Sequence, residues 1–334
     1  MKQSVVVIAL FAAVMAALPG FLGDNPYIAD ILITILMMAS LASAWNIVGG
    51  YAGQFSFGHA AYFGAGAYTT SILLTTLNPG IPVSIAAGVL VSCVIALLTG
   101  TIVFRLRGHY FALASIAVAE IVRLTVLNLD ITGGAQGILV TKVSFGSLDL
   151  NSKVPFYYAM LFLLLVTLGI SALIYRSRTG YYLLAIREDQ DAAASLGINL
   201  YLFKNIALVI SAAIASVAGS IYAVYISFID TSTVLPLRLS IEIILTTIIG
   251  GIGTLWGPVL GAVLLVSLAE ALRSNMIGEY LVNTGMVSEG SATGAFLKSN
   301  LAHAHVLVYG IITVLCILGL PKGILGFFRR KGEA

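Results

Sequence analysis

The middle of the chain reads Arg176-Ser-Arg-Thr-Gly-Tyr-Tyr-Leu-Leu-Ala-Ile-Arg187-Glu-Asp-Gln-Asp-Ala-Ala-Ala-Ser-Leu-Gly197-Ile-Asn-Leu-Tyr-Leu-Phe-Lys204. This long charged segment lies between two apolar runs, 156–175 and 205–229. It contains four basic residues, and loops rich in Lys and Arg stay on the cytoplasmic side of a membrane. We therefore place residues 176–204 in the cytoplasm.

The composition excludes a soluble globular domain. Of the 334 residues, 59% are hydrophobic and 9% are charged, and the mean hydropathy is +1.03. Soluble domains have about 25% charged residues. Lipid must therefore cover apolar surface that a single core could not hide. The net charge of +3 gives no indication of a nucleic-acid partner.

Apolar runs of about 20 residues, the length that crosses a bilayer, recur along the whole chain. We expect an all-α polytopic membrane protein with about ten transmembrane helices in a single domain, 1–334. A signal peptide is the alternative for the first run, because Lys2 precedes a short apolar stretch. The expected spans are 4–22, 28–48, 58–77, 83–104, 109–128, 156–175, 205–229, 239–256, 258–273 and 304–321.

The distribution of positive charge predicts the orientation. With the N-terminus inside, the cytoplasmic pieces hold most of the 17 Lys and Arg residues, as the positive-inside rule requires. Both termini are then cytoplasmic (N-in/C-in). Two longer loops, about 129–155 and 274–303, fall outside and are large enough to form a docking surface.

Glycine-rich segments occur in both halves of the chain, at 49–66 and at 250–261. Glycine permits both positive φ and close helix approach, so we expect broken or closely packed helices there. Backbone freed by such a break survives in a membrane where protein or a watery cavity satisfies it. Interrupted segments at matching places in two halves indicate an internal repeat around a translocation path. The alternative is packing alone, with Gly253, Gly257 and Gly261 on one helix face.

Polar and ionisable residues within the spans are candidates for a path or gate, since such groups are costly in lipid. Glu120 and Arg123 are three residues apart and can pair, which leaves a structural pair as the alternative. Glu242 has no evident partner within its own span. Phe55 could line a path or pack against neighbouring helices. The candidate path or gate residues are Gly50, Gln54, Phe55, Ser56, His59, Glu120, Arg123 and Glu242.

Several motifs occur together in one order: Gly50-Tyr-Ala-Gly-Gln-Phe-Ser-Phe-Gly-His59, Glu120-Ile-Val-Arg123, Thr132-Gly-Gly-Ala-Gln-Gly-Ile138, Ala185-Ile-Arg-Glu-Asp189 and Gly250-Gly-Ile-Gly-Thr-Leu-Trp-Gly-Pro-Val-Leu-Gly261. Over about 30–325 the chain resembles the M-type membrane subunit of bacterial branched-chain amino-acid ABC importers. The pair Ala135-Gln136 departs from the family pattern, and 281–303 matches none of it.

The resemblance implies a permease of the bacterial inner membrane. It would pair with a homologous second permease, two cytosolic ATPases and an extracytoplasmic solute-binding protein, and form the path with that second permease. ATP and magnesium would be bound by the ATPases, with no cofactor or metal on this chain, and the chain itself would not be an enzyme. The implied substrates are leucine, isoleucine and valine; related permeases serve other amino acids, urea or short amides.

Within 176–204 the residues predict one short helix of about nine residues. Acidic side chains favour its N-terminus, the alanines are good helix formers, and Gly197 ends it. Such a helix is marginal alone and needs a partner surface, for which we favour an ATPase over the inner leaflet. The candidate coupling residues are Arg187, Glu188, Asp189, Asp191, Ala193, Leu196 and Gly197.

Two other classes of protein remain as alternatives. An ion-driven secondary transporter would also have repeats and buried charges, but it has no need of a helix in 176–204. An intramembrane enzyme would need a catalytic cluster, and the chain contains neither HExxH nor GxSxG. It also lacks the GxxxxGK[ST] phosphate loop, so another chain must hydrolyse any ATP that drives transport.

Overall fold

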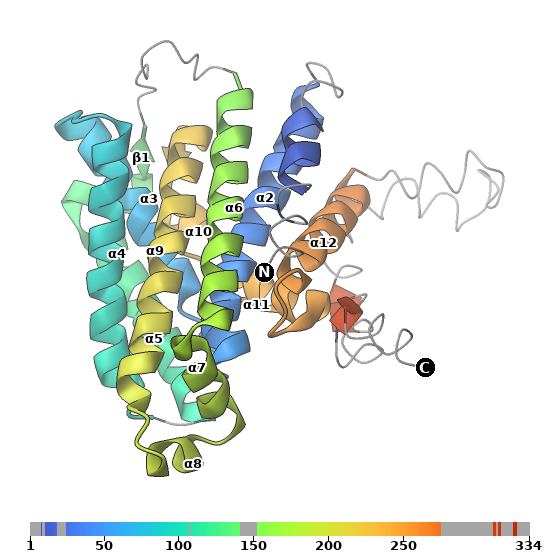
Figure 1. The fold of residues 1–334 in the computed structure, drawn as a ribbon. Helices are drawn as coiled ribbons and strands as arrows, with labels where there is room; N and C mark the ends of the chain where they lie inside the picture. Colours follow the sequence, from blue (N-terminus) through green and yellow to red (C-terminus); the bar gives the residue numbers. More distant parts are fainter. Residues whose placement is uncertain are drawn as a thin grey trace, which may run out of the picture.

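The computed structural model describes residues 8, 11–18, 25–106, 108–140, 152–274, 310, 311, 313, 314 and 323–325. Long helices run side by side through the bundle, and the short helices α7 and α8 project at one end (Figure 1). Of the expected span 4–22, residues 8 and 11–18 are described, while the expected span 304–321 and the expected loop 274–303 lie mostly outside the described residues. The helices are α2 (Pro26–Asn46), the π-helix η1 (Ile47–Tyr51), α3 (His59–Thr76), α4 (Ile81–Val103), α5 (His109–Asn128), α6 (Val154–Arg176), α7 (Arg178–Glu188), α8 (Gln190–Ser195), α9 (Leu200–Ile226), α10 (Thr231–Val234), α11 (Leu237–Gly251) and α12 (Gly257–Arg273).

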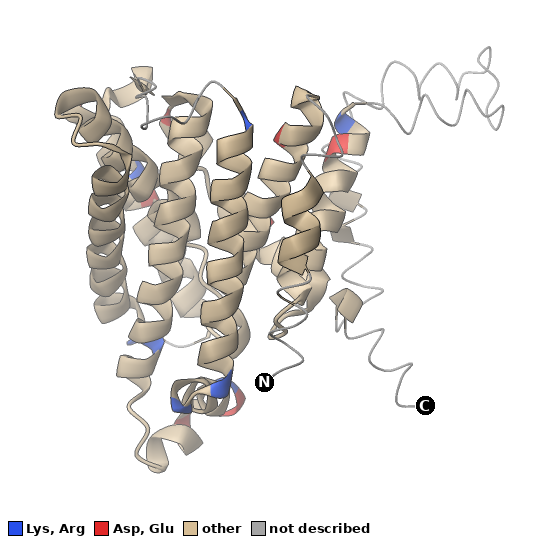
Figure 2. Cartoon of the chain, turned by 45° about the horizontal axis from the view of Figure 1, so that its top comes forward, with Lys and Arg blue, Asp and Glu red and all other residues tan. Residues whose placement is uncertain are grey.

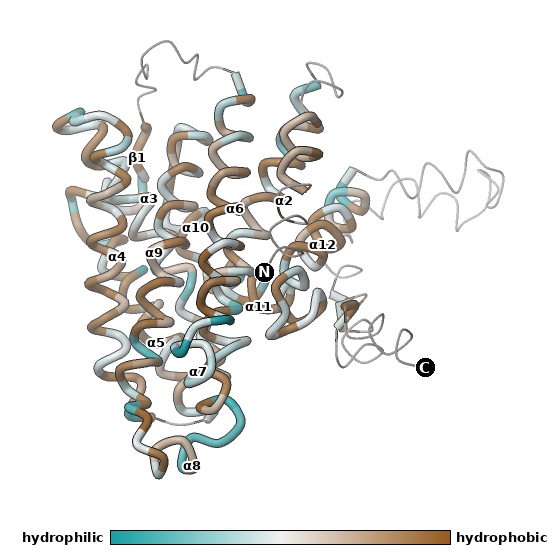
Figure 3. The backbone as a smooth tube through the Cα atoms, in the orientation of Figure 1, coloured by the Kyte–Doolittle hydropathy of each residue, from teal (hydrophilic) through white to brown (hydrophobic). Residues whose placement is uncertain are grey.

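Each of the eight expected spans between 28 and 273 corresponds to one long helix. The expected span 109–128 coincides with α5, and most other helix ends lie within a few residues of the expectation. Six of the described helices are long and apolar enough to cross a membrane. Figure 3 shows hydrophobic residues along the long helices and hydrophilic ones around α7 and α8. The chain is thus a mainly helical, polytopic membrane protein, while the total of ten spans stays a prediction.

The all-α expectation needs one correction, because two short strands connect distant loops. Strand β1 (Ile138–Leu139) pairs antiparallel with β2 (Phe228–Ile229), Ile138 opposite Ile229. The chain reaches β1 through two 3₁₀ turns, η2 (Asp130–Thr132) and η3 (Gly134–Gln136). Gly137 has φ of 75°, and a Cβ there would lie 2.4 Å from the Ile229 carbonyl oxygen. Glycine therefore permits this close pairing.

The centre of the bundle is built on α2, α3 and α9. In α2 with η1, 83% of the apolar window is buried, against 22% in α4 and 17% in α5. Helices α3 and α9 approach closely: a Cβ at Gly219 would lie 1.9 Å from the Phe63 carbonyl oxygen, and Ser220 Oγ donates to the Gly66 carbonyl at 3.1 Å. Small residues allow this contact. Helices α4 and α5, with the low buried shares given above, lie at the periphery of the bundle.

The glycines at the end of α11 and in α12 have two different roles, breaking a helix and allowing close packing, which the sequence did not distinguish. Gly251 and Gly253 have φ of 130° and 76°, so they break the helix and end α11 earlier than the expected 239–256. Gly257 and Gly261 lie on α12, where added Cβ atoms would meet the carbonyls of Gly251 and Thr246 at 2.3 and 2.0 Å. Packing accounts for these two, whereas Gly253 lies in the turn and not on their helix face.

Charged residues concentrate at the ends of the bundle (Figure 2). Basic residues gather where α6 ends and α7 begins. Lys153, the N-cap of α6, and Arg273, the last residue of α12, lie at the opposite end, beside the start of α2. The two ends are called here the α7 end and the α12 end.

Candidate functional site

A buried amide joins the two glycine-rich segments at the α7 end. Asn46, at the end of α2, is 2% exposed. Its Nδ2 donates to the Thr254 carbonyl at 2.9 Å, and its Oδ1 accepts from the Gly253 N–H at 2.8 Å. Thus one side chain satisfies two backbone groups of the turn between α11 and α12.

The two segments can approach each other this closely because glycines, which have no side chain, lie at the contact. A Cβ on Gly50 would lie 2.0 Å from Asn46 Oδ1 and 2.8 Å from the Gly253 nitrogen. A Cβ on Gly253 would lie 3.4 Å from the Gly50 carbonyl oxygen. We call Asn46, Gly50, Gly53, Gly253 and Thr254 the glycine junction. It brings together segments about 200 residues apart, one from each half.

Arg187 inserts into this junction from the last turn of α7. Its Nη1 donates to the Gly50 carbonyl at 3.0 Å, where a cation complements the negative end of a helix. Added Cβ atoms would lie 2.8 Å from Arg187 Cγ at Gly53 and 2.9 Å from Arg187 Nη1 at Gly253. The same guanidinium donates to Glu188 Oε1, at 2.8 Å from Nη2 and 3.2 Å from Nε. Arg187 therefore contacts both glycine-rich segments.

The segment 176–204 forms two helices, and the expectation of one nine-residue helix is wrong. Asp189 interrupts the helical path with φ of −155° and ψ of 116°, and its carboxylate accepts from the N–H groups of Asp191 and Ala192. Asp189 is therefore the N-cap of the six-residue α8. Glu188 ends α7 and does not begin α8. The predicted acidic start and stop at Gly197 match α8, which is shorter than nine residues, whereas α7 was not predicted.

Helix α8 ends at the glycine that the sequence predicts. Gly197 has φ of 83°; its N–H bonds the Ala194 carbonyl, and the Ile198 N–H bonds that of Ala193. This pattern is a Schellman motif. Ala193 is buried, whereas Leu196, the C-cap, is 82% exposed. An exposed leucine at the tip of α8 is thus available to a partner.

Contacts with α9 anchor both α7 and α8 to the bundle. Lys204 of α9 is 2% exposed and donates to Gln190 Oε1 at 2.7 Å. Tyr182 of α7 packs on Phe203 with ring centroids 4.7 Å apart. Movement of α8 would therefore be felt by α7 and α9.

The expected polar path residues between η1 and α3 lie mostly inside the protein. Gln54, Ser56 and His59 are at most 3% exposed. Gln54 donates to the Ala52 carbonyl at 3.1 Å, and His59 Nε2 lies 2.6 Å from Ser211 Oγ. Phe55 is 43% exposed and meets Trp45 edge-on. Their role in a path stays a prediction.

Serine side chains satisfy the freed backbone at the start of α3. The Phe57 N–H donates to Ser115 Oγ of α5, and the Ala60 N–H donates to Ser240 Oγ of α11, both at 2.9 Å. Sequence reasoning missed both serines. Irregular backbone within a membrane needs hydrogen-bond partners. The glycine-rich segment before α3 therefore predicts that polar side chains lie nearby, but it does not say which residues supply them.

Two ion pairs are formed within single helices, one on α5, which the sequence predicted, and one on α11, which it did not. Arg123 Nη2 lies 2.5 Å from Glu120 Oε1, as their spacing predicts. The view that Glu242 lacks a partner is wrong: Arg238 Nε donates to Glu242 Oε1 at 2.7 Å. Helix α11 begins at Leu237, before the expected 239, so Arg238 lies one turn from Glu242 on the same helix.

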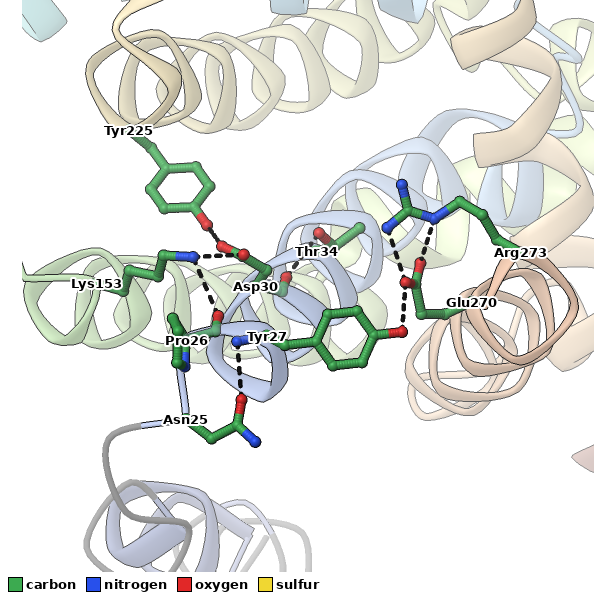
Figure 4. A network of polar contacts seen from close by, with 9 residues as sticks. All are labelled: Asn25, Pro26, Tyr27, Asp30, Thr34, Lys153, Tyr225, Glu270 and Arg273. Carbon is green, nitrogen blue, oxygen red and sulfur yellow. Dashed lines mark hydrogen bonds and ion pairs between the residues drawn. The ribbon is translucent and has the colours of Figure 1, made fainter. Parts of the chain in front are cut away.

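A different polar network joins the helices at the α12 end (Figure 4). Asp30 of α2 accepts from Lys153 and from Tyr225 of α9. Tyr27 donates to Glu270 Oε1 at 2.7 Å, and Arg273 pairs with Glu270 at 2.8 Å. This outer network therefore links α2 to α6, α9 and α12 through side chains.

Comparison with known proteins agrees with this architecture. Residues 27–317 match the family model described as "Branched-chain amino acid transport system / permease component". The high-affinity branched-chain amino acid transport system permease protein LivM of Salmonella typhimurium is 30% identical over 269 residues, 73% of this chain and 63% of the relative. LivM of Escherichia coli is 29% identical with the same coverage.

A third relative is matched over more of its length. The permease protein BraD of Pseudomonas aeruginosa, also of a high-affinity branched-chain amino acid transport system, is 26% identical over 86% of this chain and 91% of its own. The chain spans about 63% of the length of the LivM relatives. No solved structure matches it at a significant level. Since the family model covers most of the chain, the protein belongs to the permease component family of branched-chain amino acid transport systems.

Proposed function

We propose that this chain is the membrane-spanning permease subunit of an ATP-driven, binding-protein-dependent importer of branched-chain or related amino acids. The observation that carries the proposal is the exposed α8, joined through Arg187 to the glycine junction. A contact surface for a cytosolic motor is thereby connected to the ends of α2 and α11. The printed names of the LivM and BraD relatives supply the substrate class.

We place the α7 end in the cytoplasm of a bacterium and the chain in its inner membrane, with both termini cytoplasmic and about ten spans. Figure 2 shows the basic residues around α6 and α7 that support this orientation. The outer network then faces the opposite side, where a solute-binding protein would dock.

The partners follow from this assignment: a homologous second permease, two cytosolic ATPases and an extracytoplasmic solute-binding protein. The chain has no phosphate-binding GxxxxGK[ST] motif, and we assign ATP, magnesium and the hydrolysis of ATP to the ATPases, with this chain as a transport subunit. Coupling would use Arg187, Glu188, Asp189, Asp191, Ala193, Leu196 and Gly197. Of these, Leu196 offers the apolar anchor and the exposed Asp191 offers a negative charge.

The path would form against the second permease beside α5 and α11. Glu120 and Arg123 are 47% and 29% exposed within a membrane span, and Glu242 is 27% exposed. Charged groups in spans face protein or water and not lipid. These ion pairs therefore face the second permease or the path. Gly50, Gln54, Ser56 and His59 would shape the path from inside the protein, and Phe55 would present its ring outward.

The test is purification of the tagged chain in mild detergent with mass spectrometry of its partners, followed by reconstitution in proteoliposomes. We expect a second permease and ATPases to copurify, and uptake of labelled leucine to require ATP and a binding protein. Uptake by the chain alone, driven by an ion gradient without ATP, would favour a secondary transporter. ATP-dependent uptake of urea or short amides instead of leucine would correct the substrate class.

A further inference from the structure

We propose that Arg187 is the positioning residue that transmits movement of α8 to the glycine junction, and so sets the geometry of the α2 and α11 ends. The inference rests on the proposed function, since it needs a motor acting on α8. It concerns how the chain responds to that motor, and it assigns Arg187 an inward role in place of direct contact with an ATPase.

The first step is the short connection between α8 and Arg187. Asp189 caps α8, and Arg187 lies two residues before it in the last turn of α7. The rest of α7 is firmly packed: Leu183 and Ile186 are fully buried, and a Cβ on Gly180 would lie 2.1 Å from the Ile174 carbonyl oxygen. A displacement of α8 therefore acts on the α7–α8 boundary, two residues from Arg187, as well as on α9 through the contact of Gln190 with Lys204.

The second step is the reach of the guanidinium. One nitrogen donates to the Gly50 carbonyl while the other two donate to Glu188. The planar fork of arginine supplies donors in several directions at once, which a lysine ammonium on a flexible stem does not reproduce. Glu188 therefore holds the guanidinium in the orientation that meets Gly50.

The third step is that α2 and α11 end as one unit at the junction. Asn46 bonds the Gly253 N–H and the Thr254 carbonyl, and Thr247 Oγ1 of α11 donates to the Ala42 carbonyl of α2 at 3.1 Å. Helix α2 continues directly into the π-helix η1, a geometry that is frequent at functional sites. Positive φ at Gly251 and Gly253 gives the α11 end a turn that glycine can readjust.

The competing explanation is that Arg187 merely satisfies a helix-end carbonyl and stabilises the fold. The two roles differ in what a substitution changes. A stabilising residue affects uptake and ATP hydrolysis together with the melting temperature. A positioning residue changes the number of substrate molecules imported per ATP hydrolysed while the assembled complex remains intact.

The experiment uses the complete importer in proteoliposomes and measures leucine uptake, ATP hydrolysis and melting temperature for each variant. Arg187→Met keeps the aliphatic stem beside Gly53 and removes all donors; we expect uptake per ATP to fall at least tenfold. Arg187→Lys should restore part of this ratio through a single donor to Gly50. The matched control is Arg178→Met, which removes an exposed arginine from the first turn of the same helix and should leave the ratio within twofold of wild type.

Glu188→Gln provides a second variant that leaves the junction itself intact, and it should lower the ratio by two- to fivefold. An unchanged ratio in Arg187→Met, or a parallel loss of uptake, hydrolysis and melting temperature in both variants, would overturn the inference. If the wild-type complex shows no ATP-dependent uptake, the proposed function fails instead, and the two failures are thereby distinguished.

Discussion

The glycine junction and the outer network both join α2 to distant helices, but they use opposite means. At the junction, Asn46 and Arg187 bond backbone groups that only glycines allow to come close. At the α12 end, Asp30 and Glu270 bond the side chains of other helices (Figure 4). The junction is therefore sensitive to the shape of the backbone, and the network to charge.

The two sites also differ in burial, and therefore in how much their contacts contribute to the free energy of unfolding. Asn46 is 2% exposed, and a buried polar group without a partner costs about 1–3 kcal/mol. Lys153 and Asp30 are 35% and 44% exposed, and exposed ion pairs contribute about 0–1 kcal/mol. We expect substitutions at the junction to affect both stability and transport, and those in the outer network to have small effects.

The largest effect is expected for Gly50→Ala. The new Cβ would lie 2.8 Å from the backbone nitrogen of Gly253, so the two segments must separate. We expect a loss of about 3 kcal/mol or more in unfolding free energy, at or above the upper part of the range for overpacking, and uptake reduced at least tenfold. The control is Gly169→Ala in α6, where the Cβ meets nothing within 4 Å and helix propensity favours alanine. Equal behaviour of the two variants would contradict the comparison.

Asn46→Leu should follow in magnitude. It removes both the acceptor for the Gly253 N–H and the donor to the Thr254 carbonyl, leaving two backbone groups unpaired. We expect a loss of about 2–4 kcal/mol in unfolding free energy, below the sum for two fully buried groups at about 1–3 kcal/mol each, because Gly253 and Thr254 are only partly buried. Thermal unfolding in detergent measures it. Asn128→Leu, an exposed amide bonded to its own helix, should change stability far less; a similar loss would argue against a special role for the junction.

The ion pair between Lys153 and Asp30 in the outer network should contribute less to the free energy of unfolding. In a double-mutant cycle with Asp30→Asn and Lys153→Met, we expect a coupling energy of about 0.5–1 kcal/mol, because both side chains are partly exposed. Chemical unfolding of the four proteins gives the value. A coupling above about 2 kcal/mol would mean that the two ends of α2 are held equally strongly.

The smallest effect is expected for Tyr27→Phe. Glu270 loses one donor at 2.7 Å but keeps its ion pair with Arg273, so its carboxylate stays partnered. We expect a loss of about 1 kcal/mol or less in unfolding free energy and unchanged uptake. A tenfold fall in uptake would instead give this hydroxyl a role in transport.

The positions of the helices could be predicted because their cause is local. A bilayer requires about 20 apolar residues in each span, and Pro and Gly mark where spans end, so 109–128 coincides with α5. Gly197 ended its helix as predicted. The ion pair of Glu242 could also have been found, since Arg238 is four residues away; an expected span that began at 239 hid it.

The division of 176–204 had a local signal, an Asp suited to N-capping, that the expectation of a single helix did not use, whereas the pairing of β1 with β2 had none. Asp189 divides 176–204 into two helices because its side chain satisfies the backbone better as a cap than within a continuous helix. The pairing of β1 with β2 joins loops about 90 residues apart, and it depends on how α9 meets the turn at Gly137.

The sequence by itself determined the class of protein, most of its spans, the two glycine-rich segments and the family resemblance. Each of these follows from residue type and spacing along the chain. Only the tertiary structure decided that the two segments meet, that Asn46 joins them and that Arg187, 137 residues from Gly50, turns inward to bond its carbonyl. The physical reason is that a backbone carbonyl has the same chemistry in every residue, so which side chain reaches it depends on how the helices pack.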